Sequence, residues 1–220
     1  MPITVKHKPY GPYEKYFKRP LDVILSGAAI ISLSPIMLTT ALLVRMKLGS
    51  PVLFSQGRIG RDEKAFRLYK FRSMTDERDE NGELLPDEIR LTSFGKKLRS
   101  TSLDELPELF SILKGDMALI GPRPMPVAYL PYYKEEERII HSVRGGLIPP
   151  DVLSLHSVFD WDEQFRDEME YVKKITFNGD VRVLLSTFII LFKRNRTEYG
   201  GQVRKPLSDV RSYMKEETMV

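Results

Sequence analysis

Residues 23–44 read VILSGAAIISLSPIMLTTALLV and contain no charged side chain. A straight α-helix over this stretch would be about 33 Å long, and the hydrocarbon core of a bilayer is about 30 Å thick. Ser34-Pro35 lies in the middle, where proline removes a backbone donor and crowds the preceding turn. The stretch is therefore long enough to cross a membrane, but it is predicted to be interrupted halfway.

Basic residues flank this stretch on both sides: Lys15, Lys18 and Arg19 precede it, and Arg45 and Lys47 follow it. Such residues mark the cytoplasmic side of a membrane segment. We therefore predict a re-entrant helix–break–helix that enters and leaves the membrane on one side, built around Lys18, Arg19, Ser34 and Pro35. The alternatives are an ordinary span kinked at the proline and a buried core helix. The core helix fits less well, because such helices rarely exceed about 20 residues without a polar face.

The composition limits the classes of protein that fit. The 220 residues leave room for the membrane element and one globular domain. There are no cysteines, which excludes disulfides, thiolate metal sites and cysteine nucleophiles. The net charge is +4, with the excess near the N-terminus, as expected beside anionic headgroups. We predict a phospholipid membrane as a partner and no nucleic acid, since no nucleic-acid-binding pattern occurs.

The rest of the chain predicts a helix-rich α+β fold with a short β-hairpin. Residues 52–56 and 65–71 are strand candidates separated by a polar loop. Helices are expected over 91–103, 104–114, 131–143, 159–174 and 181–192, and Gly115 is expected to end the second. The predicted organisation is an interfacial lead-in and membrane helix over 1–48, a globular domain over 49–196, and a polar C-terminal tail over 197–220.

The most informative polar stretch is Ser102-Leu-Asp-Glu-Leu-Pro107. Pro107 belongs in the first turn of a helix, which places Asp104 and Glu105 at the helix N-terminus. One interpretation is structural: Ser102 and Glu105 form a capping box, and acidic residues are favoured beside the positive end of the helix dipole.

A second interpretation is catalytic. A helix N-terminus keeps Asp104 ionised, and an ionised aspartate is the nucleophile of aspartyl-phosphate enzymes. Two anions repel each other, so attack on a phosphate needs a divalent cation and arginines nearby. Arg99 lies one turn upstream and Arg123 lies between two prolines, and guanidinium groups bind phosphate in a bidentate fork. Walker A, dinucleotide and zinc spacings do not occur.

Further motifs follow in order across residues 18–124: Lys18-Arg19-Pro-Leu-Asp22, Phe54-Ser-Gln56, Tyr69-Lys-Phe-Arg-Ser-Met74, Leu98-Arg99, Leu113-Lys-Gly-Asp116 and Ile120-Gly-Pro-Arg-Pro124. Together with the apolar stretch and the Asp-Glu pair, this series resembles the bacterial sugar transferases known as monotopic phosphoglycosyl transferases. A weaker likeness continues to about residue 196. The resemblance favours the catalytic interpretation of Asp104.

The resemblance implies a re-entrant membrane helix and a small catalytic domain on the cytosolic face of the bacterial inner membrane. It implies transfer of a sugar-1-phosphate from a nucleotide diphosphate sugar, commonly a UDP-sugar, to a polyprenyl phosphate such as undecaprenyl phosphate. The products would be a polyprenyl diphosphate sugar and UMP, and the reaction would begin the assembly of a bacterial glycan.

The same resemblance implies roles for individual residues. Asp104 would be the nucleophile, form a covalent phosphosugar-aspartate and act as the protein ligand of Mg²⁺, while Glu105 would position it or handle a proton. Lys70, Arg99, Arg123 and Asp180 would line the site.

One loop departs from the pattern of the family. Where members carry a Pro-Gly-Ile/Leu-Thr-Gly stretch and a following Arg, residues 144–156 read RGGLIPPDVLSLH, with His156 at the expected position of the Arg. This loop is thought to close over the nucleotide sugar, so the departure leaves the sugar and the nucleotide contacts open. A membrane-bound scaffold that keeps the fold without catalysis is the alternative from another class. The number of copies in any homo-oligomer is also left open.

Overall fold

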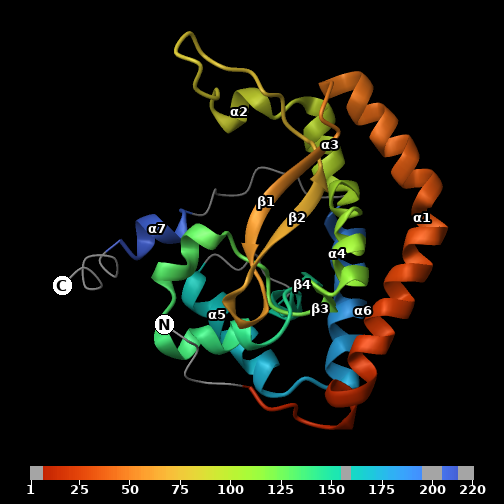
Figure 1. Cartoon of the computed structure of the whole chain (residues 1–220), viewed down its shortest axis with the longest axis vertical. Coiled ribbons are helices and arrows are strands. Elements are labelled where there is room, and N and C mark those ends of the chain that lie inside the picture. Colours follow the sequence, from red (N-terminus) through yellow and green to blue (C-terminus); the bar gives the residue numbers. More distant parts are fainter. Residues whose placement is uncertain (1–6, 155–159, 195–204, 213–220) are drawn as a thin grey trace.

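The apolar stretch forms most of one continuous helix, α1 (Lys18–Leu48), in the computed structural model, which describes residues 7–154, 160–194 and 205–212. A π-helical turn, η1 (Tyr13–Phe17), leads into it. The predicted break is wrong as an interruption of the helix, because α1 continues through Pro35 and is instead bowed (Figure 1). The hydroxyl of Ser34 donates to the Ile31 carbonyl at 2.8 Å, so this acceptor has a partner although Pro35 lacks the N–H that would reach it.

One face of α1 packs against the rest of the molecule, while the opposite face is apolar and exposed. Within its apolar window only 11% of the residues are buried, which excludes the alternative of a soluble core helix. It is the one helix in the described part of the chain that is long and apolar enough to cross a membrane. Its exposed apolar side chains include Ile24, Leu25, Ile31, Ile36, Leu38, Leu42 and Met46. An apolar helix face of this kind indicates a membrane location.

The predicted hairpin is confirmed as β1 (Leu53–Ile59) and β2 (Ala65–Phe71), which pair antiparallel with Phe54 opposite Lys70. A short 3₁₀ turn, η2 (Arg61–Glu63), connects the strands. Leu68 is buried in an apolar cluster that also contains residues of α1 and α4. Because alternate strand residues share a face, Lys70 lies on the same side of the hairpin as Leu68.

The predicted helix pair at 91–114 is present with different boundaries. After α2 (Asp87–Arg90) come α3 (Ser93–Ser100), a separate 3₁₀ turn η3 (Leu103–Glu105) and α4 (Glu108–Lys114). Asp104 and Glu105 therefore precede α4 in a turn of their own. Gly115 ends α4 as predicted, in the left-handed region with φ 106°.

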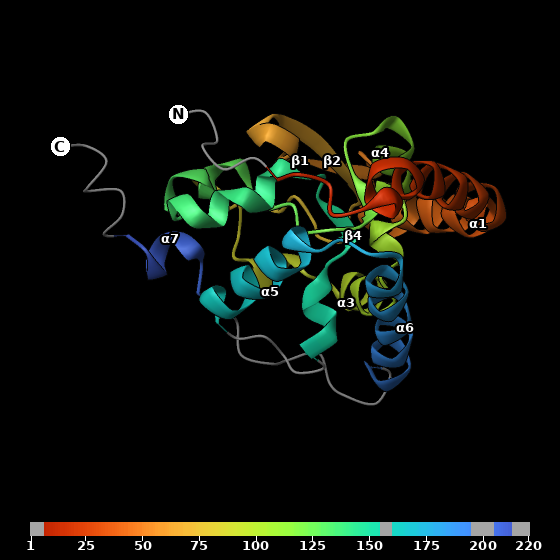
Figure 2. The ribbon, with the colours of Figure 1, turned by 90° about the horizontal axis from the view of Figure 1, so that it is seen from below.

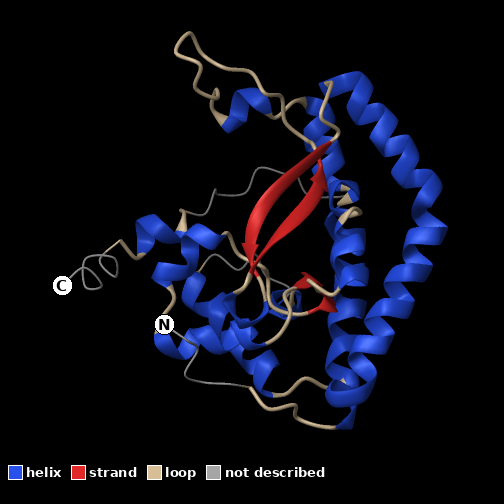
Figure 3. Ribbon diagram, viewed as in Figure 1, coloured by secondary structure: helices blue, strands red, loops and turns tan. Residues whose placement is uncertain are grey.

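A second, parallel pair of strands was not predicted. β3 (Ala118–Ile120) pairs with β4 (Gly146–Ile148), as the short central arrows of Figure 3 show. A Cβ on Gly146 would lie 2.1 Å from the backbone nitrogen of Gly121, so this close crossing requires glycine. The helix expected over 131–143 is wrong: the segment forms two 3₁₀ stretches, η4 (Val127–Tyr132) and η5 (Glu135–Ser142). Pro126 and Pro131 interrupt regular helical bonding at the first of them.

The C-terminal part supplies η6 (Pro150–Ser154), α5 (Trp161–Lys173), α6 (Phe177–Arg194) and α7 (Leu207–Val210). Viewed from below, α1 and α6 lie at one side of the molecule and α7 at the other (Figure 2). α7 belongs to the predicted polar tail, yet Leu207 is fully buried in a core cluster with Trp161 and Phe165. This part of the tail is therefore docked onto the domain.

Candidate active site

A cavity of about 430 Å³ lies between the hairpin, α3 and η3. Four of the residues predicted from the sequence line it: Lys70, Arg99, Asp104 and Glu105. They come from three separate elements, so the fold itself brings them together. These four residues bring two carboxylates and two cations together in one cavity, the groups that phosphate chemistry needs.

The Asp104 carboxylate is almost completely buried, with 7% of the residue exposed. The turn that carries it begins at Ser102, whose φ of 55° is uncommon for a residue other than glycine. The pKa of Asp104 is raised to about 6, first by burial and then by the charge of Glu105, while Lys70 and Arg99 oppose this rise. A carboxylate with this pKa is ionised at neutral pH but holds its charge in an unfavourable environment.

Lys70 is held by two carboxylates. Its Nζ lies 2.6 Å from Oε1 of Glu105 and 3.1 Å from Oε1 of Glu108. The capping-box interpretation is therefore wrong, because Ser102 makes no side-chain cap bond and Glu105 bonds to Lys70 instead. The ammonium group neutralises part of the negative charge beside Asp104.

Glu108 was missed in the sequence analysis. It is 4% exposed, and burial raises its pKa to about 7 despite the adjacent Lys70. The sequence did contain an indication that Glu108 lies near Glu105. Residues three apart on a helix lie on one face, and Glu108 follows Glu105 by three. Arg58 was also missed: it lines both the Asp104 cavity and a smaller cavity of about 60 Å³ beside it.

The two predicted arginines lie on different sides of Lys70. Arg99 lines the main cavity, and its Nε donates to the Ser73 hydroxyl at 2.8 Å, which fixes the guanidinium. Arg123 instead lines the smaller cavity, together with Lys70, Glu105 and Glu108. Its backbone N–H donates to the buried carboxylate of Glu168 at 3.0 Å. Both cations therefore lie around the same ion-paired lysine.

Asp180 lies elsewhere. Its carboxylate accepts hydrogen bonds from Lys18 Nζ and Tyr13 at 2.6 Å each, and from Tyr171 at 2.7 Å. It ties the start of α1 to α6 and is not among the residues lining the Asp104 cavity. Arg19 also anchors α1, through the carbonyls of Ile112 and Leu113. His156 lies outside the described residues.

A magnesium ion binds through oxygen ligands, of which carboxylates are the commonest in proteins. The described residues contain no group of three or more histidine or acidic side chains arranged to hold a metal. Mg²⁺ at phosphate-transferring sites commonly uses only one or two carboxylates and takes further oxygens from the substrate. Asp104, one of the three carboxylates that line the cavity, fits that mode of binding.

Comparisons with known proteins identify the family of the chain. The family model described as bacterial sugar transferase matches residues 13–194. The chain is 43% identical over 170 residues to an uncharacterized sugar transferase, EpsL, of Bacillus subtilis, covering 77% of this chain and 84% of EpsL. It is 38% identical over 199 residues to UDP-N-acetylgalactosamine-undecaprenyl-phosphate N-acetylgalactosaminephosphotransferase of Aeromonas hydrophila, covering 87% of this chain.

A further relative is UDP-glucose:undecaprenyl-phosphate glucose-1-phosphate transferase of Klebsiella pneumoniae, 40% identical over 150 residues and 66% of this chain. The matches span only 45% of the Aeromonas protein and 32% of the Klebsiella protein. The family model covers most of the chain, including η3 and the whole of α1. The chain therefore belongs to the bacterial sugar transferase family.

Proposed function

We propose that this protein is a phosphoglycosyl transferase that moves a sugar-1-phosphate from a UDP-sugar to a polyprenyl phosphate in the membrane. The observation that carries the proposal is the buried carboxylate of Asp104 in a cavity that it shares with Lys70 and Arg99. The names of the Aeromonas and Klebsiella relatives support the substrate classes, since both contain a UDP-sugar and undecaprenyl phosphate. Those two names specify different sugars, so the proposal commits to the class of donor and not to one sugar.

In the first step, a carboxylate oxygen of Asp104 attacks the sugar-bearing phosphorus of the donor. The bond from this phosphorus to the bridging oxygen breaks, and UMP leaves with that oxygen. Arg99, whose guanidinium is fixed by Ser73, is placed to bind the phosphate oxygens. Burial favours attack, because an ionised carboxylate with few water contacts loses little solvation when it reacts.

In the second step, an oxygen of the polyprenyl phosphate attacks the same phosphorus, and the bond to Asp104 breaks. The carboxylate is regenerated and the polyprenyl diphosphate sugar is released. Glu105, paired with Lys70, is placed to accept a proton from the incoming phosphate if it arrives protonated. Asp104 would hold a bound Mg²⁺, which would supply positive charge against the diphosphate.

We propose that α1 re-enters the membrane and that the domain lies on the cytosolic face. Both ends of α1 are bonded to the same body of protein: Lys18 to Asp180 at the start, and the Leu48 carbonyl to Arg72 at the end. The exposed apolar face between these ends is free to contact lipid. Asp104 would then lie close to the headgroups, where a polyprenyl phosphate presents its phosphate.

The test is UMP release from a panel of UDP-sugars by the purified full-length chain, with polyprenyl phosphate and Mg²⁺. Asp104→Asn should lower turnover by about 10³-fold or more, because the amide is no nucleophile. Asp87→Asn is the matched control, since Asp87 has the same chemistry but an exposed side chain on α2. Mass spectrometry of the wild-type protein with donor alone should find a phosphosugar on Asp104. A wild-type chain without turnover on any donor would support the scaffold alternative.

A further inference from the structure

A second pocket, of about 410 Å³, shares no lining residue with the Asp104 cavity. It lies beside the C-terminal end of α4, whereas Asp104 and Glu105 precede the N-terminal end of that helix. Its walls come from the lead-in to α1, the first turn of α1, the loop of the hairpin, β3 and the segment before β4. Tyr171 near the end of α5 and Ile175 after it complete the walls, so the pocket is a separate site built from six parts of the chain.

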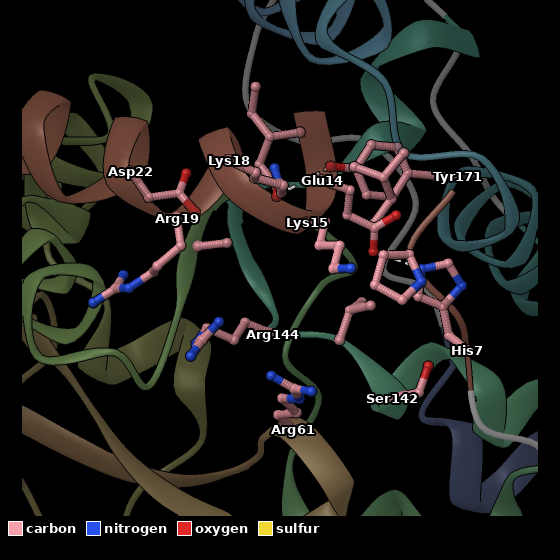
Figure 4. A pocket seen from close by; sticks show the side chains of 16 residues that line it. His7, Glu14, Lys15, Lys18, Arg19, Asp22, Arg61, Ser142, Arg144 and Tyr171 are labelled. Carbon is pink, nitrogen blue, oxygen red and sulfur yellow. Dashed lines mark hydrogen bonds and ion pairs between the residues drawn. The ribbon is translucent and has the colours of Figure 1, made fainter. Parts of the chain in front are cut away.

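Cations predominate in this pocket. Five basic side chains line it: Lys15, Lys18, Arg19, Arg61 and Arg144. Two carboxylates, those of Glu14 and Asp22, also line it, and both already accept hydrogen bonds. Figure 4 shows Arg19, Arg61 and Arg144 gathered at one side of the pocket. The described residues thus leave an excess of positive charge around a space large enough for a small anion.

A structural role explains part of this cluster. Arg19 donates to the last carbonyls of α4, and Nε of Arg144 donates to the Gly115 carbonyl at 2.7 Å, as cations do at helix C-termini. Lys18 is paired with Asp180. In the described part of the chain, however, no carboxylate oxygen lies within 4.0 Å of Lys15, Arg19 or Arg144, which leaves their charges without an ion-pair partner.

The surroundings of Arg144 are unfavourable for its charge. Burial lowers the pKa of Arg144, and the nearby charges of Arg19 and Arg61 lower it further. A bound anion would offset this mutual repulsion, and the remaining guanidinium nitrogens of Arg144 and Arg61 suit the geometry of phosphate oxygens.

We propose that this pocket binds the phosphate group of a phosphate ester. The position of the pocket makes a lipid headgroup one source of that group, because Lys15 and Arg19 lie beside the start of the apolar stretch. Tyr16 and Phe17 next to them are exposed, as aromatic side chains at the level of lipid headgroups are. A soluble phosphate ester is the other source. The site would add a phosphate contact outside the cavity of the proposed transfer reaction.

Lys15→Gln/Arg61→Gln tests the proposal with little risk to folding, because both side chains are exposed. The matched control is Lys96→Gln/Arg67→Gln, which removes the same charge from exposed residues of α3 and β2. The full-length chain would be titrated with glycerol 1-phosphate in detergent. It would also be titrated in nanodiscs of phosphatidylcholine into which phosphatidylglycerol is introduced, with the thermal unfolding midpoint as the readout.

The pocket variant should bind one of the two probes about 30-fold more weakly than the control variant, since each removed cation weakens binding to an anionic surface several-fold. Loss confined to phosphatidylglycerol would identify the lipid headgroup as the source. Loss confined to glycerol 1-phosphate would identify a soluble ester, and loss shared by both probes would support phosphate binding from either source. Equal binding by the pocket and control variants for both probes would overturn the proposal. Activity is not the readout, so the result is independent of the proposed transfer reaction.

Discussion

Lys70 Nζ lies 2.6 Å from Oε1 of Glu105, the residue that follows the proposed nucleophile, and this contact sets the charge balance of the cavity. The same ammonium group lies 3.1 Å from Glu108 and also opposes the rise in the pKa of Asp104. One lysine thus stabilises three neighbouring carboxylates. Its substitution should change the pH dependence of the reaction as well as its rate.

Lys70→Met should move the acid limb of the pH–rate profile to higher pH. In the wild-type protein, activity should rise with pH up to the pKa of Asp104 at about 6, because only the carboxylate attacks. Without the ammonium group, the pKa of Asp104 rises further, so activity at pH 6 should fall by about tenfold or more. The measurement is UMP release from pH 5 to 8. Lys64→Met, at an exposed position before β2, should leave the profile unchanged, and an unshifted profile for Lys70→Met would contradict this role.

Glu108→Gln should change how stability depends on pH. The folded protein keeps the proton of Glu108 up to a pKa of about 7, whereas the unfolded chain releases it near its ordinary pKa of 4.5. The free energy of unfolding contributed by this group therefore decreases as pH rises from 4.5 to 7, by about 3 kcal/mol. Gln cannot titrate, so the variant should gain stability relative to wild type across this window. Thermal unfolding from pH 4 to 8 measures the difference, with exposed Glu88→Gln as the control.

Arg211→Gln should destabilise the whole domain. The guanidinium of Arg211 is buried and bonds to both carboxylate oxygens of Glu137, at 2.7 and 2.8 Å, and to Asp162. Its removal leaves Glu137 buried without its cation, which costs about 3 kcal/mol or more. The unfolding midpoint should fall by about 10 °C, while exposed Lys205→Gln should change it little. An unaltered midpoint would show that docking of α7 contributes little to stability.

Single introduced cysteines should report the topology of α1 without interference, because the natural chain has no cysteine of its own. If α1 re-enters, Tyr10→Cys and Asp209→Cys should both react with a membrane-impermeant maleimide from the same side of sealed vesicles. Leu38→Cys, on the exposed apolar face of α1, should react from neither side. Labelling of positions 10 and 209 from opposite sides would contradict the re-entrant arrangement and favour a span kinked at the proline.

The elements that depend on local pattern could be predicted from the sequence. The hairpin followed from two strand-like runs around a polar loop, and the end of α4 followed from Gly115. Parallel pairing of β3 with β4 could not be predicted, because each strand has three residues and the partners lie far apart in the sequence. The docking of α7 depends on the pairing of Arg211 with Glu137, which no local pattern indicates.

In the candidate site too, residues that belong to sequence motifs could be predicted, whereas features that arise from tertiary packing could not. Asp104, Glu105, Lys70 and Arg99 were identified from motifs, and the structure places all four in one cavity. Asp180 was assigned to the site from a weaker likeness, but it lies beside Lys18. Glu108 was overlooked because a glutamate at the start of a helix has an ordinary explanation in the helix dipole. Its burial, which makes it informative, arises only from tertiary packing.

The hydrogen bond from Ser34 to the Ile31 carbonyl has a consequence for how the shape of α1 is encoded. The carbonyl that Pro35 leaves without its usual donor accepts from the Ser34 side chain, so a bend at this point leaves no backbone carbonyl of Ile31 unpaired. A Ser-Pro pair placed in the middle of an unrelated apolar helix should therefore allow a bend without an unpaired carbonyl in lipid. Evolution could then alter the remaining apolar residues to suit different lipids without losing this geometry.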